Sequence, residues 1–332
     1  PGSFQWSAGM SGRFSWNQMM TRFPGFLALI IMLVAIAINA FLQPNMLALD
    51  TLNSNMRVFL PLIFLAVGQT FVMLGGGIDI SVGGIVSIVN VILATRIGLE
   101  GSNNLMWQYT LVALFAAVLA GAINGFFIAF LRLQPIITTF ATGFLYAGFA
   151  LYILPFPGGG IPRNISEIYR TTTPINIPLA FFVITIILAV WWYIRSTRFG
   201  RYLYAVGGNA EAAYQSAVPV RRVIFSTYVI SGLLAGFSGL AITMLSGSGN
   251  ADIGAAMTLT AITAVVIGGT ALSGGVGGVE GSIMGAITLG LINNIISFAK
   301  INTWWETLIK AVIIVVALAA PGAIDLIRRR RE

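Results

Sequence analysis

The stretch at residues 195–222, RSTRFGRYLYAVGGNAEAAYQSAVPVRR, carries five arginines between two long apolar runs near 178–194 and 222–245. In a chain with 57% hydrophobic and 8% charged residues, such a basic loop is unusual. Membrane proteins keep loops rich in Lys and Arg on the cytoplasmic side. The stretch therefore predicts a cytoplasmic loop of a membrane protein, with a central segment suited to contact a partner.

The rest of the composition supports a membrane protein. A chain of 332 residues with a mean hydropathy of +0.91 has too little polar surface for a soluble globule. Apolar runs near twenty residues each suffice to cross a hydrocarbon core of roughly 30 Å. They predict an all-α polytopic membrane protein with about ten transmembrane helices, since a β-barrel would show ten-residue alternation. The expected spans lie near 24–42, 58–74, 80–98, 109–131, 135–154, 178–194, 222–245, 259–272, 276–297 and 305–321. The spans flanking 75–79 and 272–276 are candidates for broken or re-entrant, Gly-rich helices.

Positive charge predicts the orientation. With the N-terminus in the cytoplasm, 12 of the 18 basic residues fall on the cytoplasmic side, so both termini are expected there. We expect an N-terminal cytoplasmic tail at 1–23, a transmembrane domain at 24–321 that includes the loop 195–222, and a basic cytoplasmic tail at 322–332. The residues before Met10 are expected to be a non-native remnant. Because the net charge of +8 sits at the ends of apolar runs, no nucleic acid is expected as a partner, whereas membrane lipid is.

The residue types present exclude several classes of metal site and catalytic site. The chain has no Cys and no His, so thiolate or imidazole metal sites, disulfides and the usual general base are not expected. Near the spans the carboxylates are Asp79, Glu280 and Glu306, which is too few for an intramembrane catalytic site. No relay of charged residues runs through successive spans, as an ion-driven pump would need. Asp79 either caps a helix that starts at Ser81 or acts in gating. Glu306 and Lys310 form a helical i, i+4 pair that is expected to be structural.

Neutral polar residues occur within the apolar runs. Amides and hydroxyls both donate and accept hydrogen bonds, so they suit a neutral polyol as a transported solute. They suit interhelical hydrogen bonds equally well. The candidates for a translocation pathway are Asp79, Ser81, Asn90, Asn124 and Asn293.

Glycines cluster inside the spans. The pairs Gly121/Gly125 and Gly232/Gly236 are small-xxx-small faces, which predict close helix packing within the chain, with contact between two copies as the alternative. Residues 76–84, GGIDISVGG, are echoed by residues 268–275, GGTALSGG. Such Gly pairs unwind helices in transporters, and the echo suggests a duplicated half, although ordinary tight turns produce the same pattern.

The basic loop has a substructure of its own. Gly207-Gly208 predicts a tight turn, and Asn209 is a good N-cap for a short helix over Ala210–Ala217, with Glu211 in its first turn. Pro219 limits that helix. The loop is either a topogenic segment held on anionic headgroups or a contact for a partner protein.

Three ordered motifs resemble those of sugar-uptake ABC permeases, the ribose, xylose, arabinose and galactoside group. The segment 71–84, FVMLGGGIDISVGG, is similar to the "GGIDLSVG" signature of that family. The segments 197–201, TRFGR, and 204–209, YAVGGN, resemble its "T-x-FGR…YAxGGN" loop. The segment 264–275, AVVIGGTALSGG, resembles its "AVVxGGTxLxGG" stretch, and together the likeness spans about residues 55–320.

The resemblance implies the transmembrane permease subunit of an ATP-binding-cassette importer for a monosaccharide or similar small polyol. Such a subunit forms a dimeric pore in the bacterial inner membrane, powered by a cytoplasmic ATP-binding chain and supplied by a periplasmic or extracellular substrate-binding protein. It is not an enzyme and has no cofactor, because ATP is used by the partner subunit; this chain contains no P-loop motif. Residues 204–218 resemble the coupling helix of the family. The ATPase-coupling residues carried over by motif position are Arg198, Gly200, Gly207, Gly208, Asn209 and Glu211.

The chain also departs from the family pattern. Thr258-Leu259-Thr260 stands where an acidic residue, Leu and then Asp or Asn are usual, and Thr139-Phe140-Ala141 replaces a "TLG". These departures leave open which solute is carried, and the sequence leaves open the gate and the choice between homodimer and heterodimer. The alternative function is an ion-coupled secondary transporter of a small polar solute.

Overall fold

The computed structural model describes residues 25–171 and 173–302, together with residues 304, 305, 308, 311, 312 and 315. The predicted tails at 1–23 and 322–332 and the Glu306–Lys310 pair lie outside these residues. The described part is built from helices, with one isolated β-bridge between Gly158 and Gly249. In chain order the elements are α2 (Phe26–Leu42), α3 (Leu49–Leu74), α4 (Val82–Arg96), α5 (Asn103–Ala129), α6 (Pro135–Ile153), α7 (Arg163–Thr171), the 3-10 helix η1 (Pro174–Asn176), α8 (Leu179–Ser196), α9 (Arg198–Gly208), α10 (Ala210–Gln215), α11 (Val220–Ser246), α12 (Met257–Ile267) and α13 (Val279–Phe298).

Six of the described helices are long and apolar enough to cross a membrane, namely α3, α5, α6, α8, α11 and α13. Three further apolar helices, α2, α4 and α12, are shorter. The all-helical membrane architecture is therefore confirmed. Most of the expected span 305–321 falls outside the described residues.

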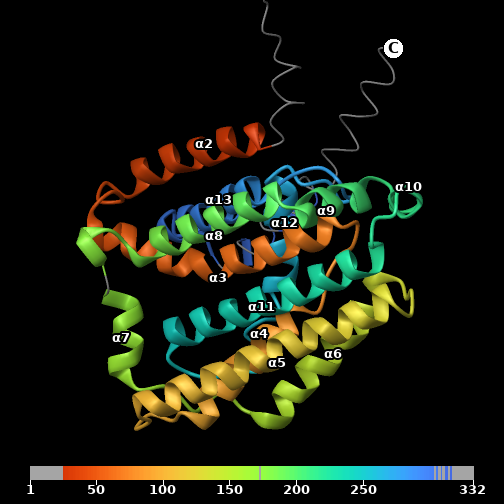
Figure 1. Ribbon diagram of the computed structural model, residues 1–332. Coiled ribbons are helices and arrows are strands. Elements are labelled where there is room, and N and C mark those ends of the chain that lie inside the picture. Colours follow the sequence, from red (N-terminus) through yellow and green to blue (C-terminus); the bar gives the residue numbers. More distant parts are fainter. Residues whose placement is uncertain are drawn as a thin grey trace, which may run out of the picture.

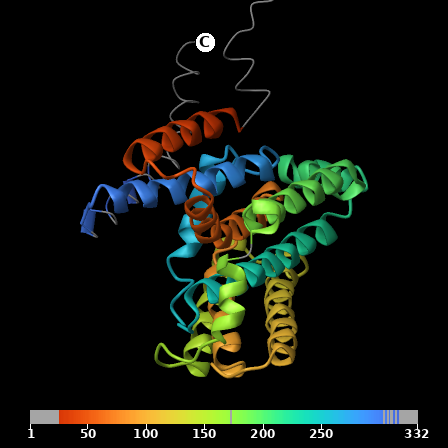
Figure 2. The same cartoon turned by 90° about the vertical axis from the view of Figure 1, so that its left-hand side faces the viewer.

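The long helices run side by side in one bundle with two distinct ends. Figure 1 shows α3, α5, α8 and α11 crossing the view, with α7 at the left end and α9 and α10 at the right end. Helix α11 lies at the centre, because it packs against α3, α4 and α5. Helix α13 packs between α2 and α12, a layer visible again after the 90° turn (Figure 2).

Helix α3 begins at Leu49, nine residues before the predicted start of its span at 58. Its first turns carry polar residues, which lower the hydropathy of that part without breaking the helix. Asn53 Nδ2 donates to the Arg170 carbonyl at 3.0 Å, and Arg57 Nη1 donates to the same oxygen at 2.7 Å. The partner is α7, a polar helix that lies within the stretch 155–177, which the sequence indicates as a loop.

Close packing of α5 on α11 depends on small residues. A Cβ on Gly121 would lie 2.4 Å from the Tyr228 carbonyl oxygen, and one on Gly232 would lie 2.5 Å from that of Ala117. These glycines therefore let the two backbones touch, as small-xxx-small faces do in membranes. The predicted intrachain packing of the pairs Gly121/Gly125 and Gly232/Gly236 is confirmed.

Two of the shorter helices are preceded by non-helical chain that is partly buried in the bundle. Residues 75–81 lead into α4, and residues 247–256 lead into α12. The two starts meet: a Cβ on Gly254 would lie 2.0 Å from the Gly83 carbonyl oxygen. With 15 residues α4 is about 22 Å long, less than a hydrocarbon core of roughly 30 Å. The predicted break near 75–79 is confirmed, and a second entry into the bundle at 247–256 is added to it.

Candidate functional site

The basic loop folds into two short helices at one end of the bundle. Thr197 caps the first of them, α9, by accepting a hydrogen bond from the Gly200 amide at 3.4 Å. Arg198 is exposed on this helix, whereas Gly200 is buried against the Ile194 carbonyl. The prediction of a tight turn at Gly207-Gly208 is wrong, because both residues form the last turn of α9. The chain turns one residue later, at Asn209, whose backbone is extended with φ −160°.

The predicted short helix is confirmed as α10. Asn209 is its N-cap: the Oδ1 atom accepts from the Ala212 amide at 3.0 Å. Glu211 lies exposed in the first turn, near the positive end of the helix dipole. The helix ends at Gln215, two residues earlier than predicted, because Ala217 adopts a left-handed conformation with φ 60°. Only Ala213 of α10 is buried, so this helix presents most of its surface outward.

Gly207 brings α9 into contact with two other backbone segments. A Cβ at this position would lie 1.7 Å from the Leu74 carbonyl oxygen and 2.6 Å from the Gly275 nitrogen. Those two groups are hydrogen-bonded to each other at 3.1 Å. A Cβ on Gly274 would lie 2.7 Å from the Gly207 carbonyl oxygen and 2.9 Å from the Gly76 Cα. We call this set, Leu74, Gly76, Gly207, Gly274 and Gly275, the glycine junction.

The glycine junction joins the two sequence echoes. At the end of α3, Gly76 has φ 82° and the Gly77 amide donates to the carbonyl five residues earlier, at Val72. At the end of α12, Gly269 has φ 83° and the Thr270 amide donates to the carbonyl five residues earlier, at Val265. Both helices thus end in the same left-handed glycine turn. After these turns the segments diverge, since the first leads into α4 and the second into α13.

A carboxylate ties α8 to the start of α13 beside the glycine junction. Glu280 accepts hydrogen bonds from the indoles of Trp191 at 2.9 Å and Trp192 at 2.8 Å, and Arg195 lies 3.6 Å from it. Tyr204 of α9 completes the cluster by donating its hydroxyl to the Gly277 carbonyl at 2.7 Å. Burial raises the pKa of the Tyr204 phenol, so the hydroxyl remains a donor. The sequence gives no local signal that Trp191 and Trp192 donate hydrogen bonds to Glu280, because α8 and α13 are far apart in the chain.

A second polar cluster lies deep in the bundle around Asp79. Its Oδ1 accepts from the Ser81 amide at 3.0 Å and the Ser81 hydroxyl at 2.6 Å, and its Oδ2 accepts from the Ser231 hydroxyl at 2.9 Å. Asn124 donates to the Ser81 hydroxyl at 2.7 Å, which extends the cluster to α5. The predicted capping is borne out only in part, because Asp79 accepts a single amide, that of Ser81, whereas α4 begins at Val82 with Ser81 as its N-cap and without a side-chain cap bond. A role of Asp79 in gating stays a prediction. The Asp79 carboxylate also fastens the 75–81 segment to α11.

Asn90 holds the other inserted segment. Its Nδ2 donates to Thr243 Oγ1 at 2.9 Å and to the Ser248 carbonyl at 3.1 Å, and its Oδ1 accepts from the Asn250 amide at 2.7 Å. Like Asp79, Ser81 and Asn124, it is fully buried and bonded to protein atoms. The pathway role of these four residues stays a prediction. Asn293, the fifth candidate, is exposed on α13 and borders a pocket.

The residues that depart from the family pattern occupy three different environments. Thr258 accepts from the Gly83 amide at 3.1 Å and so fastens the start of α12 to the start of α4. Thr260 borders the same pocket as Asn293. Phe140 is 54% exposed on α6 and packs edge-to-face on Phe144.

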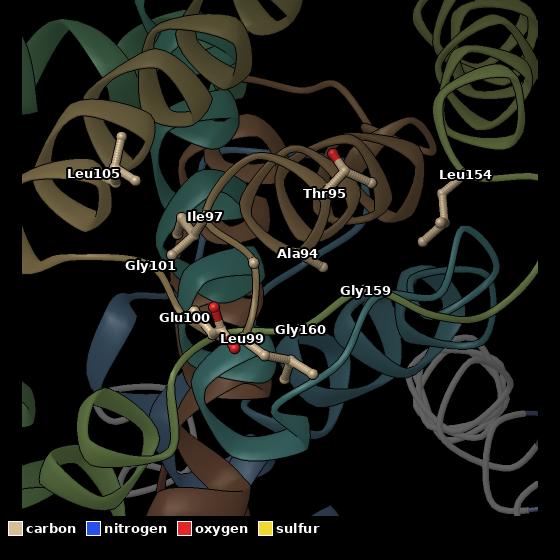
Figure 3. Close-up of a pocket in the computed structure, with 11 residues that line it drawn as sticks. Ala94, Thr95, Ile97, Leu99, Glu100, Gly101, Leu105, Leu154, Gly159 and Gly160 are labelled. Atoms are coloured by element: carbon tan, nitrogen blue, oxygen red, sulfur yellow. The ribbon is translucent and has the colours of Figure 1, made fainter.

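A larger hollow of about 830 Å³ lies at the opposite end of the bundle from α9 and α10. It is bounded by the connection between α4 and α5, which carries Leu99 and Glu100, and by the segment through Gly159 and Gly160 (Figure 3). Glu100 is the charged residue among the described lining residues. The sequence offers no motif there, because the hollow is formed by segments about sixty residues apart.

Comparison with known proteins places these features in a family. Residues 51–318 match the family model described as branched-chain amino acid transport system / permease component. The chain is 33% identical over 302 residues to the ribose import permease protein of Haemophilus influenzae, covering 89% of this chain and 91% of that protein. It is 34% identical over 264 residues to the autoinducer 2 import system permease protein of Photorhabdus luminescens, with 79% and 78% covered. It is 29% identical over 307 residues to the galactose/methyl galactoside import permease protein of Escherichia coli, with 87% and 91% covered.

No solved structure matches the chain. The family match nevertheless covers the glycine junction, the capped helix α10 and both inserted segments. Helices long enough to cross a membrane agree with a transport role. The chain belongs to this family of multi-pass transport permeases, whose members are translocation components rather than enzymes.

Proposed function

We propose that this chain is the permease subunit of an ATP-binding-cassette importer that carries a monosaccharide or a similar small polyol. The similar permeases are named for ribose, for galactose and methyl galactoside, and for autoinducer 2, and each is an import permease. The neutral amides and hydroxyls within the spans suit such a solute. ATP is used by a separate partner chain, and this subunit needs no cofactor of its own.

The observation that carries the proposal is the joint formed by α9, α10 and the glycine junction. Helix α10 is capped at Asn209 and presents Glu211 and Tyr214 outward, so a partner protein can bind to these side chains. Directly behind it, Gly207 touches the ends of α3 and of the turn before α13 without any intervening side chain. Because backbone contacts do not compress, a push on α10 is passed to both turns as a rigid-body movement.

The finer topology is part of the same proposal. The α9–α10 end faces the cytoplasm with both termini, in keeping with the arginines of the loop. About ten transmembrane helices then lie in the bacterial inner membrane, and a second permease copy or a paralogue completes the pore. The hollow beside Glu100 is at the opposite end, where a periplasmic or extracellular substrate-binding protein would deliver the solute.

The proposed role of each coupling residue follows from its position in the structure. Glu211 and Asn209 lie on the exposed surface that would contact the ATPase, and Arg198 lies exposed on α9. Gly207 belongs to the glycine junction behind that surface, and Gly200 lets α9 pack on the end of α8. Asn293 is the pathway candidate with access to a pocket.

The test is recovery of partners from native membranes in mild detergent. The tagged chain is expected to bring down an ATP-binding chain, and replacement of Glu211 by Lys is expected to release it without loss of folded protein. Replacement of Glu100 by Lys, at the other end, is the matched control and should retain the partner. Recovery of a folded chain without any ATP-binding chain, together with uptake driven by an ion gradient, would instead establish the secondary transporter.

A further inference from the structure

A small pocket lies where α3, α12 and α13 meet. Its volume is about 200 Å³, and its lining includes Phe59, Met257, Thr260, Gly290, Asn293 and Asn294. It is distinct from the glycine junction and from the hollow beside Glu100. We call it the amide pocket.

The amide pocket lies near the ends of the three spans that form it, on the side away from α9 and α10. Phe59 is the second residue of the expected span 58–74, Thr260 is the second of 259–272, and Asn293 lies four residues before the end of 276–297. On α3, Phe59 closely follows Arg57, which donates to a carbonyl of the polar helix α7. The pocket is therefore close to the membrane surface at that end of the bundle.

Three uncharged polar side chains meet at this level. The Thr260 hydroxyl donates to the Ala256 carbonyl at 2.8 Å, which leaves its oxygen free to accept. Asn293 is exposed, and the Nδ2 of Asn294 is buried without a hydrogen-bond partner among the described residues. A buried donor without a partner costs about 1–3 kcal/mol, and hydrocarbon contact would add to that cost for the exposed amide. Water or a polar solute therefore has to supply the hydrogen bonds that these side chains lack.

The pocket also has an apolar wall. A Cβ on Gly290 would lie 2.3 Å from Cδ1 of Phe59, so the glycine lets the phenyl ring lie directly against α13. An apolar wall facing a few placed polar groups is the usual composition of a small-molecule site. A closed cavity of roughly 150 Å³ accommodates benzene in another protein, so a pocket of about 200 Å³ has room for one six-membered ring.

The charge of the lining separates two classes of solute. No Asp, Glu, Lys or Arg is among the nine described residues that border the pocket. A zwitterionic amino acid would bring an ammonium and a carboxylate that need charged or multiple hydrogen-bonding partners inside the pocket. An uncharged polyol needs only donors and acceptors, which amides and hydroxyls supply.

We propose that the amide pocket is a water-accessible binding station on the translocation path for a single-ring polyol. Thr260, Asn293 and Asn294 are its polar contacts, and Phe59 supplies the apolar wall. The proposal rests on the permease function above and names where the solute binds within it. It also gives Thr260, one of the family departures, a role in solute selection.

The test uses the natural absence of cysteine from the chain. Thr260→Cys, Asn293→Cys and Asn294→Cys are each labelled in native membranes with a charged thiol reagent that does not enter lipid. Phe140→Cys, which is exposed on an apolar surface, and Thr288→Cys, which is buried, are the controls. Because only a hydrated thiolate reacts, the pocket positions are expected to label about tenfold or more faster than both controls. Rates equal to those of Phe140→Cys would show that the face lies in lipid and would overturn the proposal.

The solute class is tested by protection of Thr260→Cys. Ribose or galactose is expected to slow the labelling, whereas leucine is not. Protection by leucine alone would overturn the polyol assignment, and protection by none of the three would overturn the binding role. Labelling needs no ATP, so failure here leaves the recovery of an ATP-binding chain, and with it the proposed function, as a separate result.

Discussion

The two adjacent glycines at the end of α9 provide a matched pair of substitutions. Gly207→Ala places a methyl group 1.7 Å from the Leu74 carbonyl oxygen and 2.6 Å from the Gly275 nitrogen. Gly208→Ala places the same methyl group where no atom lies within 4 Å. Both residues are helical with negative φ, so neither substitution strains the backbone. The pair therefore isolates the close contact from every other effect of replacing glycine.

The magnitude follows from what has to move. Backbone atoms cannot rotate away, so α9 has to retreat by more than an ångström and separate the hydrogen bond between Gly275 and Leu74. Overpacking costs about 1–3 kcal/mol and the lost hydrogen bond about 0.5–1.5 kcal/mol. Alanine regains roughly 0.5–1 kcal/mol relative to glycine in a helix interior. Gly207→Ala is thus expected to lose about 0.5–4 kcal/mol, whereas Gly208→Ala is expected to be neutral or slightly stabilising.

Thermal unfolding of the purified chain in detergent measures the stability, and ATP hydrolysis by the assembled complex measures coupling. Gly207→Ala is expected to lower Tm by about 2 °C for each kcal/mol lost and to lose stimulation of ATP hydrolysis by the substrate, whereas Gly208→Ala is expected to keep Tm at or slightly above the wild-type value. Equal Tm and equal stimulation in the two variants would refute the glycine junction as a point of contact. A lower Tm with normal stimulation would leave it a packing contact and remove its part in coupling.

Three further predictions concern single hydrogen-bonding groups. Asn209→Ala removes the cap of α10 and should cost about 1 kcal/mol and weaken ATPase binding, whereas Asn209→Asp should retain both; titration of the ATPase chain measures this. Glu280→Gln replaces one acceptor oxygen by a donor facing an indole and should cost about 1–3 kcal/mol in thermal unfolding, with exposed Glu211→Gln as the neutral control. Asp79→Asn leaves either Ser81 or Ser231 without its acceptor and should cost about 1–3 kcal/mol; an unchanged Tm would contradict the hydrogen bonding around Asp79.

Local patterns predicted local structure well. Apolar runs of sufficient length indicated the helices, because satisfying backbone groups in lipid leaves few alternatives. The cap at Asn209 and the amide acceptor at Asp79 were predicted because each needs only a polar side chain two or three residues from its donor. The prediction of a turn at Gly207-Gly208 was wrong because it also depended on neighbouring residues alone. Glycine permits a turn but does not enforce one. At position 207 glycine is needed because other backbone segments pack too closely for a side chain.

The sequence by itself determined that this chain is a helical membrane protein with a basic loop, a capped short helix and broken spans. These properties depend on hydropathy, charge and short-range hydrogen bonds, which are written in neighbouring residues. Only the tertiary structure decided which glycines touch, which indoles hold Glu280, and which polar side chains line a pocket rather than the core. Asn124 and Asn293 look alike in sequence, yet one bonds to Ser81 in the interior and the other faces a pocket. That difference depends on the packing of helices distant in the chain, since a side chain's surroundings are set by its neighbours in space.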